Sequence, residues 1–551
     1  MAMNSMRNRR VPSAVVVVAV AVVVGVAFGT ATARMQDRVQ ARYRVYAQAL
    51  AAIEQGYVEP VDAHCTSAAP CGAEALIYDS IDGMLRTLDP HSSFFTPRDF
   101  RAMRERQEGR YFGIGIQISQ SDGNVVVSSL FEGSPAYRSG IRRGDIIARV
   151  GSEQAKDWTT QDVVDRVKGP RGTTVEIGIR RPNVDGEIAL TVPRDEIRIP
   201  SVRTAFMFDA TTGYVRLQDF SETTNTELGE ALTKLKASGM QRLMLDLRDN
   251  PGGPLTQAIN VSSRFLRLGQ MVVYTRGRIP NSDEDYHVEN QGGFPDVPLI
   301  VLVDRQSASA SEIVTGSMQD HDRGLVVGET TFGKALVQSV YPISNGAGLA
   351  LTTGRYYTPS GRLIQRPWDG SFDEYQMYSL RDQDPTRAHP ASELKYTDHN
   401  RKVYGGGGIE PDHFIAGPVE GFNPSRFGRA MMCPGRCDFV GFAERFAREG
   451  DGRPGSKSSS GAHKVTSGWK ITDAMMDEFR TYVAGRRLVI DEAAFKADEA
   501  FIRAMIHFEV DVDLFGVEEA RRNLSLVDPQ VQAASGYFDE ARQLLSMKKA
   551  S

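Results

Sequence analysis

A serine-rich segment and a lysine further along the chain are the residues of this sequence best suited to catalysis. The segment reads Ser307-Ala-Ser-Ala-Ser-Glu312 and leads into a predicted helix, whose first N–H groups would be free to stabilise an oxyanion. A serine nucleophile needs a base, and a desolvated lysine serves when its pKa is lowered. Lys334 and Gln338 are four positions apart in a predicted strand, so they share a face on which Gln338 can hold the lysine amine.

The same residues also have plainer interpretations. Ser309 and Glu312 form the S-x-x-E pattern of a helix capping box, and a single lysine is most often a solvated surface charge. The stretch Gly328-Glu-Thr-Thr-Phe-Gly-Lys334 matches a phosphate-binding P-loop. We reject the P-loop because Ala335 lacks the hydroxyl that would bind magnesium, and because the residues after it predict a strand where a P-loop opens a helix.

A glycine-bearing loop upstream predicts a site for peptide C-termini. It comprises Tyr111, Phe112, Gly113, Ile114, Gly115 and Ile116. The two glycines let successive N–H groups point into one concavity, which suits a terminal carboxylate, and the strand that follows can pair with an extended peptide. Short β-runs continue to about residue 193, with one helix at about 160–167. A plain hairpin is the alternative, but the segment as a whole resembles a PDZ domain.

The remaining elements would position these groups. Strand-like and helical segments alternate between about residues 211 and 418, which predicts a parallel or mixed sheet with helices packed on it. Apolar residues recur at three- and four-residue steps from about 36 to 107 and favour helices there. After a Gly/Ser-rich linker, the C-terminal segment is again helical and has no readable chemical motif. A net charge of −4 over 551 residues argues against nucleic-acid binding.

The N-terminus bears on the location of the protein. Three arginines precede an uncharged, Val/Ala-rich run from Val11 to Gly29 that is long enough to span a bilayer, and Ala31-Thr-Ala33 resembles a cleavage site. We expect a single-pass anchor in the inner membrane or a cleaved signal. In both cases the residues after 34 would be exported to the periplasm, within the cell envelope.

The four cysteines form two close pairs in the sequence. Their spacings do not match a zinc site, and disulfides are the natural interpretation in an oxidising compartment. The residues are Cys65, Cys71, Cys433 and Cys437. Their pairing stays open, and a bridge between the two distant regions is one of the alternatives.

From about residue 80 to 415 the chain resembles the C-terminal processing peptidases, the tail-specific protease family. The motifs that carry the resemblance follow the family's order: Gly83-Met-Leu-Arg-Thr-Leu-Asp-Pro-His-Ser92, the loop at 111–116, Leu245-Asp-Leu-Arg-Asp-Asn-Pro-Gly-Gly253, the serine run, Gly328 to Lys334 with Gln338, Tyr356-Tyr-Thr-Pro-Ser-Gly361 and Gly405-Gly-Gly-Gly-Ile-Glu-Pro-Asp412. One departure is Ala335, where the family usually has glycine after the lysine. A positive φ there would strain an alanine.

The resemblance implies roles for individual residues. Ser309 would be the nucleophile, Lys334 the general base and Gln338 the group that orients the lysine. The oxyanion hole would use the N–H groups of Ala310 and Gly253, with Gly252 as the neighbouring alternative. The loop at 111–116 would bind the substrate, and no metal or cofactor is required.

By this resemblance we expect an exported serine endopeptidase of α/β multi-domain fold with a crotonase-like core. Its predicted parts are a signal or anchor (1–34), an N-terminal helical region (35–108), a PDZ domain (109–195), the peptidase core (196–448), a linker (449–466) and a C-terminal helical module (467–551). The PDZ domain would capture free C-termini of protein or peptide substrates and control their cleavage. Further candidate partners are an adaptor or regulator, a second copy of the chain, and the membrane, which the N-terminal segment would contact. The alternative is a catalytically inactive, membrane-tethered PDZ scaffold or assembly factor.

Overall fold

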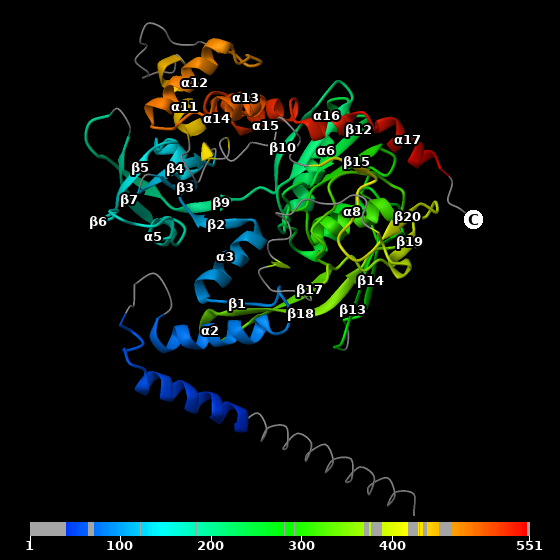
Figure 1. The fold of residues 1–551 in the computed structure, drawn as a ribbon, viewed down its shortest axis with the longest axis horizontal. Coiled ribbons are helices and arrows are strands. Elements are labelled where there is room, and N and C mark those ends of the chain that lie inside the picture. The colour runs from blue at the N-terminus through cyan, green and yellow to red at the C-terminus, as the bar shows by residue number, and fades with distance from the viewer. Residues whose placement is uncertain are drawn as a thin grey trace, which may run out of the picture. The chain divides into compact units, whose positions relative to one another are not determined.

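The computed structural model describes residues 40–63, 71–121, 123–131, 133–181, 184–279, 282–290, 292–368, 374–375, 388–416, 428, 430–432, 438–450 and 465–547. The chain divides into two compact units, Met1–Met84 and Leu85–Ser551. The second unit contains all the strands found in the described residues (Figure 1).

The described part of the first unit is helical. Residues 40–56 form a helix, and α2 (Gly72–Arg86) starts in this unit after a break. The hydroxyl groups of Tyr46 and Ser80 join the two helices by a hydrogen bond of 2.6 Å. Cys71, just before α2, is disulfide-bonded. The other three cysteines, at 65, 433 and 437, lie outside the described residues, so their pairing stays a prediction.

The membrane anchor predicted for the N-terminus is not supported, and the location derived from it is corrected. Among the helices within the described ranges, none is both long enough and apolar enough to cross a bilayer. The helix at 40–56, for example, carries Arg42, Arg44 and Glu54. The predicted span from Val11 to Gly29 lies outside the described residues. The single-pass inner-membrane placement and the periplasmic location that followed from it are therefore withdrawn.

Helix α3 (Pro97–Glu108) leads into a region of short strands. Its elements are β2 (Arg110–Gly113), β3 (Ile116–Ser121), β4 (Asn124–Leu130), α4 (Pro135–Arg138), β5 (Ile146–Val150), β6 (Glu153–Gln154), α5 (Thr160–Val167), β7 (Thr174–Arg180), β8 (Ile188–Pro193) and β9 (Asp195–Arg198). One sheet has the order β3-β4-β5-β7-β8, with β6 beside β5, and β2 pairs with β9. Helix α5 has the predicted bounds, and Thr159 and Asp162 cap it reciprocally.

Six strands form the central sheet in the order β10-β11-β12-β15-β16-β21. They are β10 (Val202–Met207), β11 (Thr212–Leu217), β12 (Arg242–Asp246), β15 (Leu299–Val303), β16 (Leu325–Gly328) and β21 (His413–Phe414). All neighbours pair in parallel except β10 and β11, which are antiparallel, so the sheet is mixed, which is one of the two forms that the sequence predicted. Apolar residues of α6 (Thr224–Ala237), α7 (Leu255–Ser263) and α8 (Ala310–Asp320) share one buried cluster with this sheet.

A second sheet lies beside the first and carries the lysine segment. Its order is β1-β18-β13-β14, and β17 pairs with the other part of β18. The strands are β1 (Ser93–Phe95), β13 (Met271–Gly277), β14 (Glu284–His287), β17 (Leu336–Pro342) and β18 (Gly348–Tyr357). Short 3-10 turns, η1 (Ser344–Gly346) and η3 (Ala391–Glu393), and the hairpin β19 (Leu394–Tyr396) with β20 (Lys402–Tyr404) complete this region.

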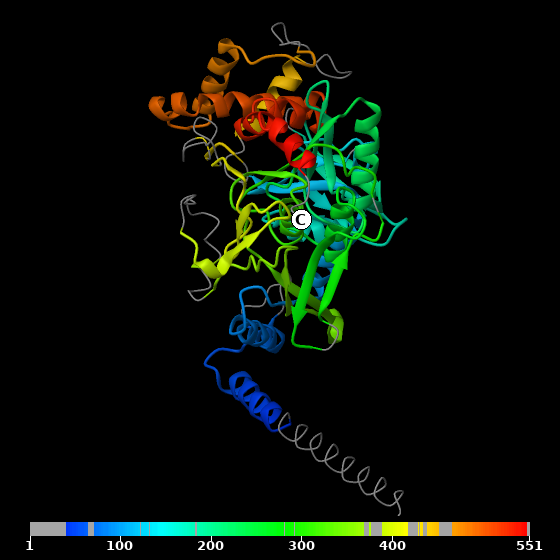
Figure 2. The same cartoon turned by 90° about the vertical axis from the view of Figure 1, so that its right-hand side faces the viewer.

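The C-terminal helices form two groups with different contacts. They are α11 (Asp438–Gly450), α12 (Asp473–Gly485), α13 (Glu492–Ala497), α14 (Glu499–Leu514), α15 (Val517–Ser525), α16 (Pro529–Ser535) and α17 (Phe538–Ser546). The helices α11 to α14 share an apolar core of their own. Apolar residues of α16 and α17 instead pack on the central sheet, beside β12 and β15 (Figures 1 and 2).

Ionic contacts tie the first helical group to the PDZ-like region. Arg143 pairs with Glu509 and Asp513 of α14, with 3.0 Å between its Nη1 and the Asp513 carboxylate.

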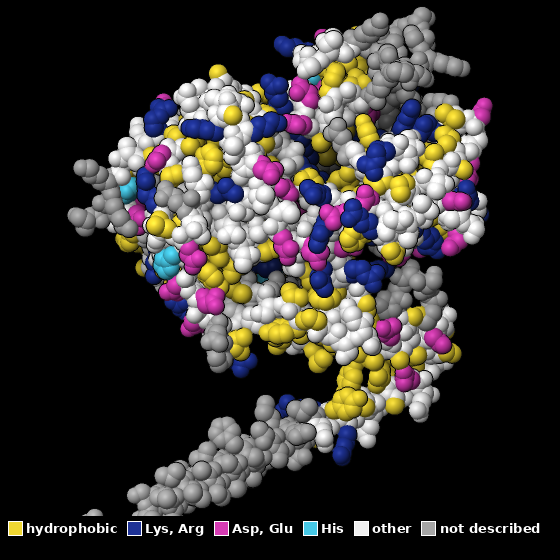
Figure 3. Space-filling model, turned by 180° about the vertical axis from the view of Figure 1, so that it is seen from behind, with side chains coloured by type: hydrophobic (Ala, Val, Ile, Leu, Met, Phe, Trp, Pro, Cys, Tyr) yellow, Lys and Arg dark blue, Asp and Glu magenta, His cyan; other side chains and the backbone are white. Residues whose placement is uncertain are grey.

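On the face seen in Figure 3, basic and acidic side chains are interspersed, in keeping with totals of 65 basic and 69 acidic residues.

Candidate active site

Ser309 stands at a sharp turn between β15 and α8. Its backbone has φ 56° and ψ −111°. Non-glycine residues rarely adopt such a conformation, which costs on the order of 1–3 kcal/mol and persists only where the surroundings impose it. The Ser309 side chain is partly exposed, whereas Ala308, Ala310 and the rest of α8 are buried. The turn thus presents one hydroxyl at the N-terminus of a buried helix.

The loop after β12 lies directly against this turn. Gly252 has φ +93°, and a Cβ there would lie 2.6 Å from Ala308 O, 2.8 Å from Ala310 N and 2.8 Å from Ser309 Cβ. Gly253 has φ +157°, and its Cβ would lie 2.1 Å from Phe220 O. Both positions therefore exclude any larger residue, because backbone occupies the space of a side chain.

Asn250 binds the two segments together. Its carbonyl oxygen accepts hydrogen bonds from Ala308 N and from Ser311 Oγ, both 3.0 Å long. Its side chain accepts from Gly252 N at 2.9 Å and donates to Leu217 O at 2.9 Å. The N–H of Gly252 is thus engaged, whereas no hydrogen bond from Gly253 N or Ala310 N is seen within the described residues.

Lys334 and Gln338 meet on the other side of the site. Lys334 Nζ donates to Gln338 Oε1 at 2.9 Å, and Gln338 Nε2 donates to the carbonyl of His91 at 2.5 Å. Strand β17 begins only at Leu336, so the contact does not arise from two residues of one strand face, as the sequence spacing suggested. The pairing with β18 is irregular between Val337 and Gln338, and a bulge of this kind re-aims a side chain.

Burial favours the neutral form of Lys334, which is the form that can accept a proton. It lowers the pKa of Lys334, although the carboxylates of Glu312 and Asp89 oppose the shift. Within the described residues, Lys334 Nζ makes no hydrogen bond to Ser309 Oγ. The amine is therefore held by Gln338 and not by the serine.

Glu312 joins the serine segment to the lysine segment. Its fully buried carboxylate accepts from Ser309 N at 2.8 Å, Lys334 N at 2.9 Å, Gly333 N at 2.7 Å and Thr331 Oγ1 at 2.5 Å. Burial raises the pKa of Glu312 to about 7, against the effect of these four donors. The hydroxyl of Tyr356 also lies within hydrogen-bond distance of the carbonyls of Ser309 and Lys334.

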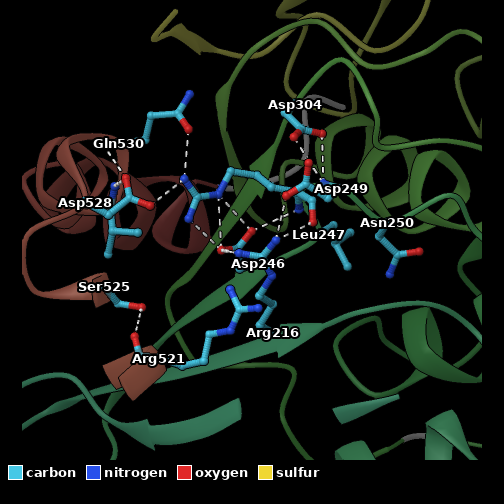
Figure 4. Close-up of polar contacts among 12 residues, drawn as sticks. Arg216, Asp246, Leu247, Asp249, Asn250, Asp304, Arg521, Ser525, Asp528 and Gln530 are labelled. Atoms are coloured by element: carbon cyan, nitrogen blue, oxygen red, sulfur yellow. Dashed lines mark hydrogen bonds and ion pairs between the residues drawn. The ribbon is translucent and has the colours of Figure 1, made fainter. Parts of the chain in front are cut away.

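A buried ionic cluster supports the loop after β12 from behind (Figure 4). Asp246, the last residue of β12, pairs with Arg248, whose Nη1 also contacts Asp528 at 2.9 Å and Gln530 at 2.8 Å. Burial alone would raise the pKa of Asp246, but Arg248 and Arg216 hold it well below its ordinary range.

A second carboxylate, Asp304, links the two loops that flank Ser309. It accepts from the backbone N–H of Asp249 at 3.0 Å and from Ser307 N at 3.0 Å. Burial and the neighbouring carboxylate of Asp249 raise the pKa of Asp304 to about 6. The loop after β12 and the loop after β15 are thus held in register by side chains as well as by Asn250.

The residues of the loop at 111–116 differ in their exposure to solvent. Phe112 is 41% exposed and Ile114 only 1%, so the side chain of Ile114 belongs to the core. Gly115 has φ +83°, and a Cβ there would lie 2.3 Å from Ser134 Cβ. Gly113 is buried, while Tyr111 and Ile116 are partly exposed.

Several residues of the site were not singled out from the sequence. Glu312 was considered only as a helix cap, and Asn250, Tyr356, Asp89 and His91 only as parts of longer motifs. Asn250 had a readable signal, because it follows the carboxyl end of a buried parallel strand, where functional groups gather. The concern about Ala335 is resolved, because it is not among the described residues with positive φ, and its N–H donates to Gln365 at 2.8 Å.

Comparisons with known proteins identify the family to which this sequence is similar. The sequence model of Peptidase family S41 matches residues 211–369, and that of the PDZ domain matches residues 101–180. A carboxy-terminal-processing protease of Bartonella bacilliformis is 37% identical over 53% of this chain and 68% of its own length. A carboxyl-terminal-processing protease of Picosynechococcus is 34% identical over 51% of this chain and 69% of its own. The solved photosystem II D1 C-terminal processing protease is 27% identical, covers 67% of this chain and 92% of its own, and has a TM-score of 0.33.

Proposed function

Since this chain belongs to the carboxy-terminal-processing proteases of peptidase family S41 and is thus a serine-type peptidase, we propose that it cleaves peptide bonds with Ser309 as nucleophile and Lys334 as general base. The observation that carries this assignment is the Glu312 carboxylate, which binds the backbone N–H groups of both residues. This shared contact of a strained serine and a buried lysine supports the proposal that the two residues act together.

The chemistry follows from these groups. Ser309 Oγ attacks the substrate carbonyl carbon while Lys334, in its neutral form, takes the hydroxyl proton. The N–H groups of Gly253 and Ala310 bind the oxyanion, a role supported by the lack of another partner for either among the described residues. The lysine ammonium then gives its proton to the leaving amine, and water hydrolyses the ester on Ser309. Gln338 Oε1 holds the amine throughout.

The PDZ domain supplies recognition in this proposal. The backbone of residues 113–116 would bind a substrate C-terminal carboxylate, and β3 would pair with the residues that precede it. The proposal also includes control of cleavage by the PDZ domain and a capping role for the helical region that precedes it. It divides the chain into domains at residues 109, 196, 449 and 467. Regulatory adaptors and self-association are further hypotheses within it.

The test compares the purified full chain with its Ser309→Ala variant. Both are incubated with an unstructured protein that ends in small apolar residues, and fragments are identified by mass spectrometry. Cleavage by the unmodified protein alone supports the proposal. If both variants cleave, Ser309 is not the nucleophile. If neither cleaves and both bind the tail, the inactive PDZ scaffold is the better explanation.

A further inference from the structure

The orientation of the Gln338 side-chain amide is fixed by a segment that precedes the PDZ domain in the sequence. Its Nε2 donates to the carbonyl oxygen of His91, which lies 247 positions earlier in the chain. A carbonyl oxygen only accepts hydrogen bonds, so this contact decides which end of the amide faces Lys334. The acceptor Oε1 must then point at the lysine amine, where it takes one amine proton and leaves the lone pair free for the serine hydroxyl.

Asp89 holds the turn that presents this carbonyl. Its Oδ1 accepts from His91 N and from Ser92 N, both at 2.8 Å, and its Oδ2 accepts from Ser92 Oγ at 2.7 Å. Asp89 is only 8% exposed and Ser92 only 7%. The peptide that carries the His91 carbonyl is therefore tied on its N–H side to a buried carboxylate.

The same turn is attached to the strand that pairs with Gln338. Thr352 of β18 donates its backbone N–H to Ser92 Oγ at 3.1 Å and its hydroxyl to Asp89 Oδ1 at 3.2 Å. Thr352 is also the register partner of Gln338 between β17 and β18. Backbone pairing and side-chain bonding thus close a circuit that runs from Asp89 through Ser92, Thr352 and Gln338 to His91.

We propose that Asp89 is a positioning residue for the general base and acts by holding the His91 carbonyl on Gln338. The inference rests on the proposed roles of Ser309 and Lys334 and adds a residue to them. The His91 ring is not the acting group: it contacts Phe332 and Tyr375, and its Nε2 lies 2.8 Å from the Tyr375 hydroxyl. Any residue at position 91 supplies the same carbonyl.

The main experiment measures kcat and KM separately for Asp89→Ala in the full chain. Loss of the turn lets the Gln338 amide rotate, so we expect kcat to fall about 10- to 100-fold with KM within about threefold of the parent. Asp89→Asn keeps the Oδ1 acceptor for both N–H groups and should restore most of kcat. His91→Ala keeps the carbonyl and should lower kcat less than Asp89→Ala does.

Asp209 offers a matched control. Its carboxylate holds a turn in the same way, with Thr211 N and Thr212 N on Oδ1 at 2.8 Å and Thr212 Oγ1 on Oδ2 at 2.7 Å. That turn precedes β11, whereas the loop with Asn250 follows the neighbouring parallel strand β12, so the two lie at opposite ends of these strands. Asp209→Ala should leave kcat unchanged while it costs a turn of the same type.

A double-mutant cycle decides whether Asp89 acts through Gln338. In a Gln338→Ala background, Asp89→Ala should have no further effect on kcat measured at a pH above the acid limb of the profile, where the charge of Asp89 no longer alters the protonation of Lys334, because the group it positions is gone. Independent, multiplicative effects would overturn the inference, as would an unchanged kcat in Asp89→Ala. If Asp89→Ala proves unfolded by urea titration, the same cycle is run with Ser92→Ala, which removes one arm of the turn.

The proposed function fails in a different way. If Ser309→Ala or Lys334→Ala retains turnover, the dyad itself is wrong, whatever Asp89→Ala does. If both abolish turnover and the Asp89 cycle is multiplicative, the dyad stands and only the positioning role is lost.

Discussion

The two halves of the proposed active site, one with Ser309 and one with Lys334, are held by different kinds of contact. On the nucleophile side, the turn with Ser309 and the loop after β12 contact each other through backbone atoms. Asn250 and Asp304 add hydrogen bonds between the two segments. On the base side, the Lys334 amine is held by one side-chain hydrogen bond to Gln338, and that amide by one bond to a remote carbonyl. The nucleophile side is built on the central sheet and the base side on the edge strand of the second sheet.

This difference indicates where the site tolerates change. Backbone packing around Gly252 leaves less space than a methyl group needs, so the nucleophile side has one geometry. A chain of single side-chain bonds has more alternative arrangements, and each link can break without disturbing the sheet. We infer that the nucleophile is permanently set and that activity depends mainly on how the lysine is held.

The largest effect should come from removal of the base. Lys334→Ala leaves the strained serine and the oxyanion donors in place but removes the proton acceptor, so we expect kcat to fall about 10⁴-fold or more with peptide binding intact. Turnover is followed by mass spectrometry and binding by fluorescence anisotropy of a labelled C-terminal peptide. Retained turnover would remove Lys334 from the mechanism and with it the distinction between the two halves.

The nucleophile half is tested at Asn250, which connects the loop after β12 to the turn with Ser309. Asn250→Ala removes the amide that orients the N–H of Gly252 and the adjoining loop, and we expect kcat to fall about 10- to 100-fold, in line with the loss of an aligned oxyanion donor. Asn225→Ala is a suitable control, since this side chain accepts from Arg264 Nε at 2.6 Å and no hydrogen bond from it to the loop is seen within the described residues. Equal kcat for Asn250→Ala and the parent would show that backbone packing alone sets the loop.

Sequence reasoning reached the nucleophile half more completely than the base half, and the reason is physical. Ser309, Gly252 and Gly253 follow buried strands whose apolar runs are plain in the sequence, so the alternation of strands and helices that carries them was predicted. The contact of Gln338 with His91 joins two segments on either side of the PDZ domain. No local pattern encodes such a contact, because it depends on how β1 and β17 both pair with β18.

The C-terminal helices show a second limit of the same kind. Their amphipathic pattern predicted helices, yet it gave no sign that α11 to α14 form one core while α16 and α17 cover the central sheet. An apolar helix face states that something is buried without naming the partner. The strain at Ser309 was equally hidden, because a positive φ at a serine is imposed by tertiary contacts and leaves no mark in composition.

Glu312 connects the halves, and its charge should be visible in the pH profile. Glu312 and Asp89 raise the pKa of Lys334 against the effect of burial, so Glu312→Gln should lower that pKa further. The lysine acts as a base when neutral; the acid limb of kcat/KM therefore moves to lower pH in the variant. We also expect kcat to fall about tenfold, because one amide oxygen cannot accept from all four donors. An acid limb at unchanged or higher pH would contradict this account.

The smallest effect on catalysis should come from loss of a contact between the C-terminal segment and Arg248, a residue of the loop after β12. Asp528→Ala removes one of the two carboxylates of this buried arginine while Asp246 remains. We expect a loss of about 1–3 kcal/mol in the free energy of unfolding, and a change in kcat below about threefold, because the loop retains Asn250 and Asp304. Asp539→Ala, which breaks an exposed pair with Arg542 on α17, is the matched control and should cost less than about 0.5 kcal/mol. Urea unfolding measures both. If Asp528→Ala instead lowered kcat as strongly as Asn250→Ala, the nucleophile half would depend on the C-terminal helices and would be no more self-contained than the base half.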